Sequence, residues 1–105
     1  MNQIPYIKTI TDKLVANINP LKIILFGSYA YGTQTPNSDI DICVVMNSTE
    51  KPVKRRINLS KLFLNREQPI DLIVYTPEEL EQKLLNNDGF VKEIVTNGSV
   101  LYDRS

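Results

Sequence analysis

The hydrophobic residues of this chain recur with two different periods. Near the N-terminus, isoleucine and leucine return every three or four residues, the spacing of one face of an amphipathic helix. Elsewhere, short apolar runs rich in β-branched residues are bounded by Gly, Pro, Asn or Ser, which is typical of buried strands. The pattern predicts helices over residues 4–18, 28–31, 53–64, 77–85 and 89–97, and strands over 22–26, 39–45, 69–75 and 99–103.

Local signals mark where several of these elements begin or end. Asn19-Pro20 ends the first helix, because the residue before a proline is disfavoured in helical geometry. Thr76, Pro77 and Glu79 have the order of an N-cap, a first-turn proline and the third residue of a capping box. The sequence therefore predicts that a helix begins directly after the strand at 69–75.

The predicted helix over 53–64 combines apolar positions with a basic cluster. Its apolar side is predicted to consist of Val53, Ile57, Leu62 and Leu64. The segment 50–61 also holds the main basic cluster of the chain, formed by Lys51, Lys54, Arg55, Arg56 and Lys61. Such a cluster meets phosphate, RNA or an acidic partner, or else forms a solvated helix face, which is the commoner case for any one of its residues.

The elements follow one another in the order α-β-α-β-α-β-α-α-β, without repeats, low-complexity segments or linkers. This order predicts an α/β (α+β) fold in which a mixed β-sheet is covered by helices. The length of 105 residues predicts a single domain over 1–105. Periodicity does not fix the order of the strands in the sheet.

The composition of the chain limits its possible catalytic mechanisms, partners and location. Twelve basic and twelve acidic side chains cancel, which argues against nucleic acid as a direct partner. The absence of histidine excludes Ser-His-Asp and Cys-His catalysis, and Cys43, the one cysteine, excludes an intrachain disulfide. There is no signal peptide pattern and no apolar run near the roughly 18 residues that a membrane helix needs. We therefore expect a cytoplasmic protein that has no membrane contact.

Asp39 and Asp41 lie two residues apart at the head of a predicted strand. Their side chains would share one face, roughly 6–7 Å apart by strand rise. Carboxylates this close repel unless a cation lies between them, and Mg²⁺ prefers such oxygen ligands. Asp71, in the next predicted strand, could supply a third carboxylate. The competing interpretation is a solvated loop end, which is the commoner origin of an isolated Asp-x-Asp.

Gly27 and Ser28 stand between a predicted strand and a short helix. A glycine lets the backbone approach a phosphate, and the N–H groups of a helix start bind anions. An ordinary strand-to-helix turn would also favour Gly and Ser. A P-loop is excluded because Thr33-Gln34 stands where Lys-Ser/Thr is required, and Tyr29 replaces the second glycine of the dinucleotide fingerprint.

Gly27-Ser28, ten intervening residues and then Asp39-x-Asp41 resemble the signature of the DNA polymerase β-like nucleotidyltransferase superfamily. The later "PIDLIVY" run and the tail "VKEIVTNGSVLYDR" are similar to the minimal nucleotidyltransferases, in particular the MntA-type antitoxins that are encoded with HEPN-domain toxins. One position departs from the pattern, because Tyr31 stands where many relatives have arginine.

The resemblance implies a nucleotidyltransferase fold and a role for each matching residue. Gly27 and Ser28 would hold the triphosphate of ATP, and Asp39, Asp41 and Asp71 would be the catalytic residues and the ligands of Mg²⁺. The implied reaction transfers AMP from ATP to a tyrosine hydroxyl of a HEPN-family RNase toxin, which is neutralised. The toxin is the expected partner, and a complex of the two proteins is expected.

Two alternative functions stay open at this point. The protein could be a non-catalytic antitoxin that neutralises the toxin by stoichiometric binding. It could also be a nucleotidyltransferase that acts on a small molecule such as an antibiotic, although 105 residues hardly supply the extra helices that such a pocket needs.

Overall fold

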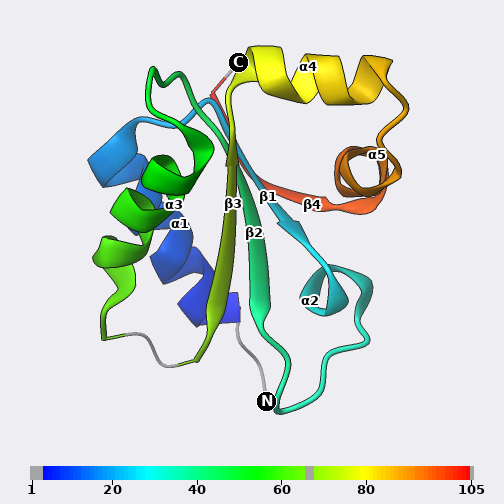
Figure 1. Cartoon of the computed structure of the whole chain (residues 1–105). Helices are drawn as coiled ribbons and strands as arrows, with labels where there is room; N and C mark the ends of the chain where they lie inside the picture. The colour runs from blue at the N-terminus through cyan, green and yellow to red at the C-terminus, as the bar shows by residue number, and fades with distance from the viewer. Residues whose placement is uncertain (1–3, 66–67, 105) are drawn as a thin grey trace.

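The computed structural model describes residues 4–65 and 68–104, which form a four-stranded mixed sheet between two layers of helices (Figure 1). The predicted helices and strands are confirmed, with boundaries that differ by a few residues at most. The elements are α1 (Ile4–Ile18), β1 (Lys22–Phe26), α2 (Ser28–Tyr31), β2 (Ile40–Val45), α3 (Pro52–Ser60), the 3₁₀ turn η1 (Lys61–Phe63), β3 (Ile70–Tyr75), α4 (Pro77–Leu85), α5 (Gly89–Asn97) and β4 (Ser99–Asp103).

The strands lie in the order β3-β2-β1-β4. β1 runs antiparallel to both β2 and β4, whereas β2 and β3 are parallel. The parallel pair requires a crossover, and α3 supplies it. β2 is thus an interior strand with a hydrogen-bonded neighbour on each side.

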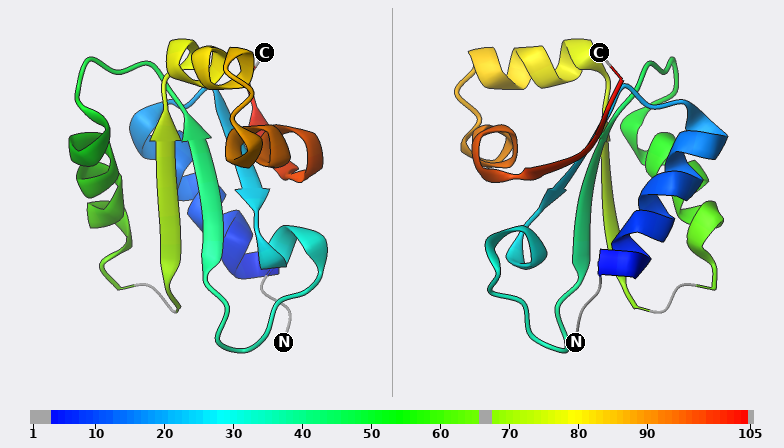
Figure 2. Two further views of the ribbon diagram at one scale, coloured as in Figure 1. Left: turned by 45° about the vertical axis from the view of Figure 1, so that its right-hand side comes forward. Right: turned by 180° about the vertical axis from the view of Figure 1, so that it is seen from behind.

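Helices cover both faces of this sheet (Figure 2). On one face, α1 and the α3–η1 segment close the larger core, which comprises Ile7, Ile10, Leu14, Ile23, Leu25, Ile40, Ile42, Val44, Leu59, Phe63, Leu72 and Val74. On the other face, Ile94 of α5 packs with Ile24, Phe26 and Cys43. Burial raises the pKa of the Cys43 thiol to about 12, so this cysteine is a packing residue. No helix among the described residues is long and apolar enough to cross a bilayer.

The predicted apolar side of α3 is wrong. Val53, Ile57 and Leu64 are exposed by 71%, 51% and 75%, and only Leu62 packs partly against the core. Leu59 and Phe63 face the sheet instead. The inward face consists of residues spaced four apart along the helix. Its first member is a charged residue, Arg55, which is only 4% exposed. Hydrophobic periodicity could not identify a face that includes a buried arginine.

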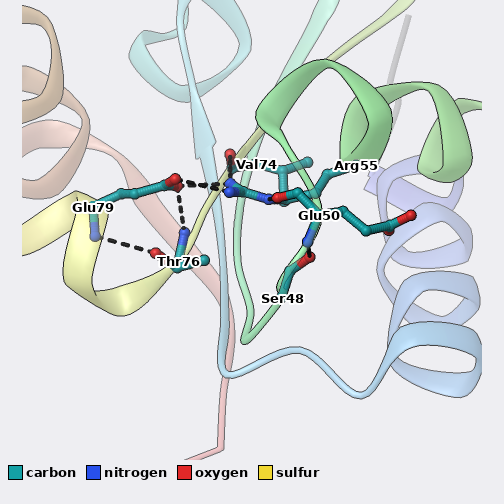
Figure 3. Close-up of polar contacts among 6 residues, drawn as sticks. All are labelled: Ser48, Glu50, Arg55, Val74, Thr76 and Glu79. Carbon is teal, nitrogen blue, oxygen red and sulfur yellow. Dashed lines mark hydrogen bonds and ion pairs between the residues drawn. The ribbon is translucent and has the colours of Figure 1, made fainter.

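Arg55 can be buried because its guanidinium N–H groups find hydrogen-bond acceptors within the protein (Figure 3). Nε donates to the Glu50 carbonyl at 2.8 Å, and Nη1 donates to the Val74 carbonyl at 3.3 Å. Nη1 and Nη2 also donate to the two carboxylate oxygens of Glu79, at 2.6 and 2.8 Å. The bidentate pair joins α3 to the start of α4, and the bond to Val74 joins α3 to the end of β3.

Glu79 uses the same carboxylate to complete the predicted capping box of α4, which is confirmed (Figure 3). Its Oε1 accepts the backbone N–H of Thr76 at 2.9 Å, while Thr76 Oγ1 accepts the backbone N–H of Glu79 at 3.2 Å. The hydrogen bond from Arg55 is the main cause that lowers the pKa of Glu79 to about 2. The cap and the ion pair are therefore one network.

Truncating Arg55 should destabilise the fold far more than truncating its neighbour. Arg55→Ala is expected to lower the free energy of unfolding by about 2 kcal/mol, because it leaves Glu79 without its partner; the partial exposure of Glu79 keeps the loss below that of a fully buried pair. Arg56→Ala, which breaks an exposed pair, should cost no more than about 0.5 kcal/mol. Urea denaturation at neutral pH measures both, and equal losses would contradict the assignment.

The same network gives stability a pH dependence. Because the folded pKa of Glu79 lies below its unfolded value, its contribution is complete above the unfolded pKa and is lost as pH falls toward 2. The stability difference between wild type and Glu79→Gln should therefore shrink as pH falls from 5 to about 2.

Candidate active site

Asp41 lies near the start of β2, where the strand register determines its neighbours. It is opposite Phe26 of β1 on one side and opposite Asp71 of the parallel strand β3 on the other. Residues in register on adjacent strands project to the same face of the sheet. The structure thus brings the Asp41 and Asp71 side chains together. Asp39, two residues before Asp41, is exposed just ahead of the strand.

The three carboxylates influence one another electrostatically. The pKa of Asp41 is raised to about 6, first by partial burial and then by the charges of Asp71 and Asp39. Negative charge is therefore concentrated at this point of the sheet, and a bound cation would relieve it.

An arginine also lies beside this group. Arg56 Nη2 donates to Asp71 Oδ1 at 3.2 Å in an exposed ion pair. The sequence analysis grouped Arg56 with the basic cluster of 50–61 and did not connect it with the acids, because the two residues come from different elements. α3 therefore borders the acidic group directly.

Gly27 forms the corner between β1 and α2. Its backbone has φ 72° and ψ −158°, and its carbonyl accepts the N–H groups of Ala30 and Tyr31 at 3.0 and 3.2 Å. A Cβ atom at this position would collide with Asp41 Oδ2. The glycine is required both by the backbone conformation and by the approach of the Asp41 carboxylate. Ser28, the first residue of α2, is half-buried beside this corner.

The loop that carries Asp39 is tied to its surroundings by Gln68. The Gln68 amide donates to the Tyr29 hydroxyl at 2.9 Å and to the Ser38 carbonyl at 3.2 Å. These bonds join α2, the residue before Asp39 and the segment leading into β3. The sequence analysis missed Gln68, because its partners lie 39 and 30 positions away and no local pattern reveals them.

Tyr31 stands at the end of α2 and is 42% exposed. The pKa of the Tyr31 hydroxyl is raised by desolvation and by the negative charge of Glu93 of α5. Many proteins of the family that this sequence resembles have arginine at this position. Here the side chain is a neutral hydroxyl near the carboxylate of Glu93.

The acids fit a hard divalent cation by their chemistry. Among residues 4–65 and 68–104, no three His, Cys, Asp or Glu side chains stand close enough to hold a metal ion as they are oriented. Asp41 and Asp71 nevertheless lie in register, and the pKa of Asp41 is raised by burial and by the neighbouring negative charges of Asp71 and Asp39. Carboxylates are the ligands that Mg²⁺ prefers, and no softer ligand lies among them.

A separate groove of about 470 Å³ lies at the other end of β2, under α4. Its lining is mainly apolar and includes Leu21, Val45, Pro77, Leu80 and Leu84. None of the five candidate residues lines this groove. It is therefore distinct from the acidic group at Asp41.

The contact between Gly27 and Asp41 can be measured by comparing two glycines. Gly32 has a similar φ of 75°, but a Cβ there would meet nothing within 4 Å. Gly32→Ala should cost about 1 kcal/mol for its left-handed backbone (ψ 18°), whereas Gly27→Ala should cost about 1–3 kcal/mol more, because its ψ of −158° lies in a region that side chains avoid and because Asp41 is displaced. Urea denaturation tests this. Adding Asp41→Ala should recover the part of the extra loss that the carboxylate causes, and a double variant with no recovery would refute the close approach.

Comparisons with known proteins agree with this arrangement. A family model described as "Nucleotidyltransferase domain" matches residues 6–103. A protein of Methanocaldococcus jannaschii, provisionally named a protein adenylyltransferase, is 42% identical over 82 residues, which is 77% of each chain. The protein adenylyltransferase MntA of Shewanella oneidensis is 39% identical over 74 residues, which is 70% of this chain but only half of that protein.

A solved structure supports the same relationship. The crystal structure of a toxin-antitoxin with AMP-PNP aligns with 93% of this chain and 74% of its own chain, at a TM-score of 0.64 and 31% sequence identity. The predicted nucleotidyltransferase fold is thus confirmed. Because the family model covers nearly the whole chain and relatives exceed 30% identity, the chain belongs to the nucleotidyltransferase domain family and is an enzyme of the nucleotidyltransferase class.

Proposed function

We propose that this protein is an antitoxin that transfers AMP from ATP to a tyrosine hydroxyl of a HEPN-family RNase toxin. The observation that carries the proposal is Asp41, which lies in register with Asp71 and against the Gly27 corner. The named relatives support the reaction class, since two of them bear the name protein adenylyltransferase and one matching structure is a toxin-antitoxin with an ATP analogue.

Each candidate residue has a role in the proposed reaction. The Gly27 backbone and the Ser28 hydroxyl bind the triphosphate, because a glycine corner at a helix start lets phosphate oxygens reach N–H donors. Asp39, Asp41 and Asp71 hold Mg²⁺, which when bound would neutralise the charge on the phosphates. Positioning and electrostatics then account for most of the acceleration, and no histidine is needed.

The chemical step is a displacement at the α-phosphorus. The acceptor oxygen forms a bond to that phosphorus as the bond to the oxygen of the β-phosphate breaks. Pyrophosphate leaves, and the hydroxyl proton passes to Asp71 on the edge strand β3 and then to solvent. The product is a phosphodiester between AMP and the acceptor side chain.

Nucleotide binding should depend on the paired aspartates. Isothermal titration of the protein with ATP in the presence of Mg²⁺ should show binding that Asp39→Asn with Asp41→Asn abolishes. Asp12→Asn, which removes an exposed carboxylate from α1, is the matched control and should bind as wild type does. Undiminished metal-dependent binding by the double variant would rule out the assignment of these residues.

Transfer of AMP should increase the mass of the partner protein. The probe is the product of the neighbouring reading frame, which the proposal expects to be a helical protein with the pattern R-x4-H-x-Y, incubated with ATP, Mg²⁺ and the wild-type protein. Intact mass spectrometry should show one or more added AMP groups, located on tyrosine by peptide mapping. A toxin that is silenced without any added mass would contradict the proposed reaction and favour stoichiometric binding.

A further inference from the structure

α3 and Leu64, the residue after η1, leave an aliphatic stripe on the outside of the molecule. Val53, Ile57 and Leu64 are exposed by 71%, 51% and 75%, and helical spacing places them on one side, opposite the face that Arg55 and Leu59 turn inward. In the left view of Figure 2, α3 (green) lies at the outer edge of the molecule, beside β3 and on the side away from α5. The stripe is therefore open to another molecule.

Lysine side chains lie next to this stripe, along one flank of α3 and η1. Lys51, Lys54 and Lys61 are exposed, and none of them forms an ion pair within the described part of the chain. The chain as a whole has no net charge, so this local excess is a property of one surface. A complementary surface would present apolar side chains surrounded by carboxylates.

The stripe also borders the candidate active site. Arg56 precedes Ile57 on α3 and pairs with Asp71 at 3.2 Å, so the edge of the stripe continues into the acidic group. α3 packs on the face of the sheet to which Leu72 points, whereas Asp71 points to the other face, so a molecule seated on the stripe would reach Asp71 past Arg56, around the edge strand β3. The groove under α4 lacks this relationship, because it lies at the opposite end of β2.

From these observations we infer that Val53, Ile57 and Leu64, with Lys51, Lys54 and Lys61 around them, form the docking surface for the acceptor protein. The inference rests on the proposed function for the identity of that protein. It adds where and how the acceptor binds: the acceptor presents an apolar patch rimmed by acidic residues to this surface, and its hydroxyl reaches Asp71.

Other occupants fit the surface less well. Proteins that bind single-stranded nucleic acid stack bases on aromatic side chains, and the stripe has none. Helices that lie on membranes insert a broad apolar face, whereas α3 has nine residues and already buries its Leu59 side in the core. Three aliphatic residues with a basic rim match the centre and the border of a protein interface.

The main test removes the aliphatic side chains. Val53→Ser with Ile57→Ser should weaken binding to the neighbouring toxin roughly tenfold or more, measured by isothermal titration without ATP. The matched control is Val95→Ser with Val100→Ser, which removes two exposed aliphatic residues from α5 and β4 and should leave the affinity within about twofold. Thermal melting should confirm that both variants fold.

A second variant tests the basic rim. Lys54→Glu with Lys61→Glu should also weaken toxin binding, and the affinity that remains should depend less on salt concentration than that of wild type. Lys92→Glu, an exposed charge reversal on α5, is the control and should change neither quantity.

The two proposals fail in different ways. If the stripe variant binds toxin and adds AMP as wild type does, the docking surface is wrong and the proposed function stands. If wild type adds no AMP but binds toxin through the stripe, the reaction is wrong and the docking surface stands. Wild type that does not bind the toxin would overturn the docking inference. Binding to RNA, or to vesicles of equal parts phosphatidylcholine and phosphatidylserine, that only the stripe variant loses would overturn it as well.

Discussion

The register of β2 is the constraint on which the candidate site depends. This interior strand aligns Asp41 with Phe26 on one side and with Asp71 on the other. A slip of one residue would turn Asp41 to the opposite face of the sheet. Burial on both faces prevents such a slip, since Ile42 and Cys43 are fully buried in different clusters. The acidic pair is thus held by the packing of the apolar residues between which it stands.

The helices are held in place by a second constraint, the pair of Arg55 and Glu79. One carboxylate caps α4 and also satisfies a guanidinium from α3, so the positions of these two helices are coupled. The coupling acts at the carboxyl end of β3, whereas Asp71 lies near the other end of that strand. The carboxyl end of β3 therefore holds α3 and α4 in place, and the amino end of the same strand carries Asp71 of the candidate site.

The sequence was sufficient to predict what depends on local pattern. It predicted the elements, the capping box at Thr76 and the Gly27 corner, because each is encoded by neighbouring residues. It could not predict the strand order, the hydrogen bonds of Gln68 or the contact between Arg56 and Asp71, because these features join residues that are distant along the chain. The rotation of α3 was predicted wrongly because a buried arginine occupies its inward face.

The rotation of α3 also bears on what its outer surface is for. Stability alone does not require Arg55 inside, since a buried ion pair can often be replaced by apolar residues without loss. An aliphatic residue at that position and polar residues in place of Val53 and Ile57 would satisfy the usual pattern of a surface helix. The chain has the opposite arrangement, which leaves apolar area in water. Another molecule that covered this area would remove it from water, and the contact of Arg56 with Asp71 connects this side of α3 to the acids.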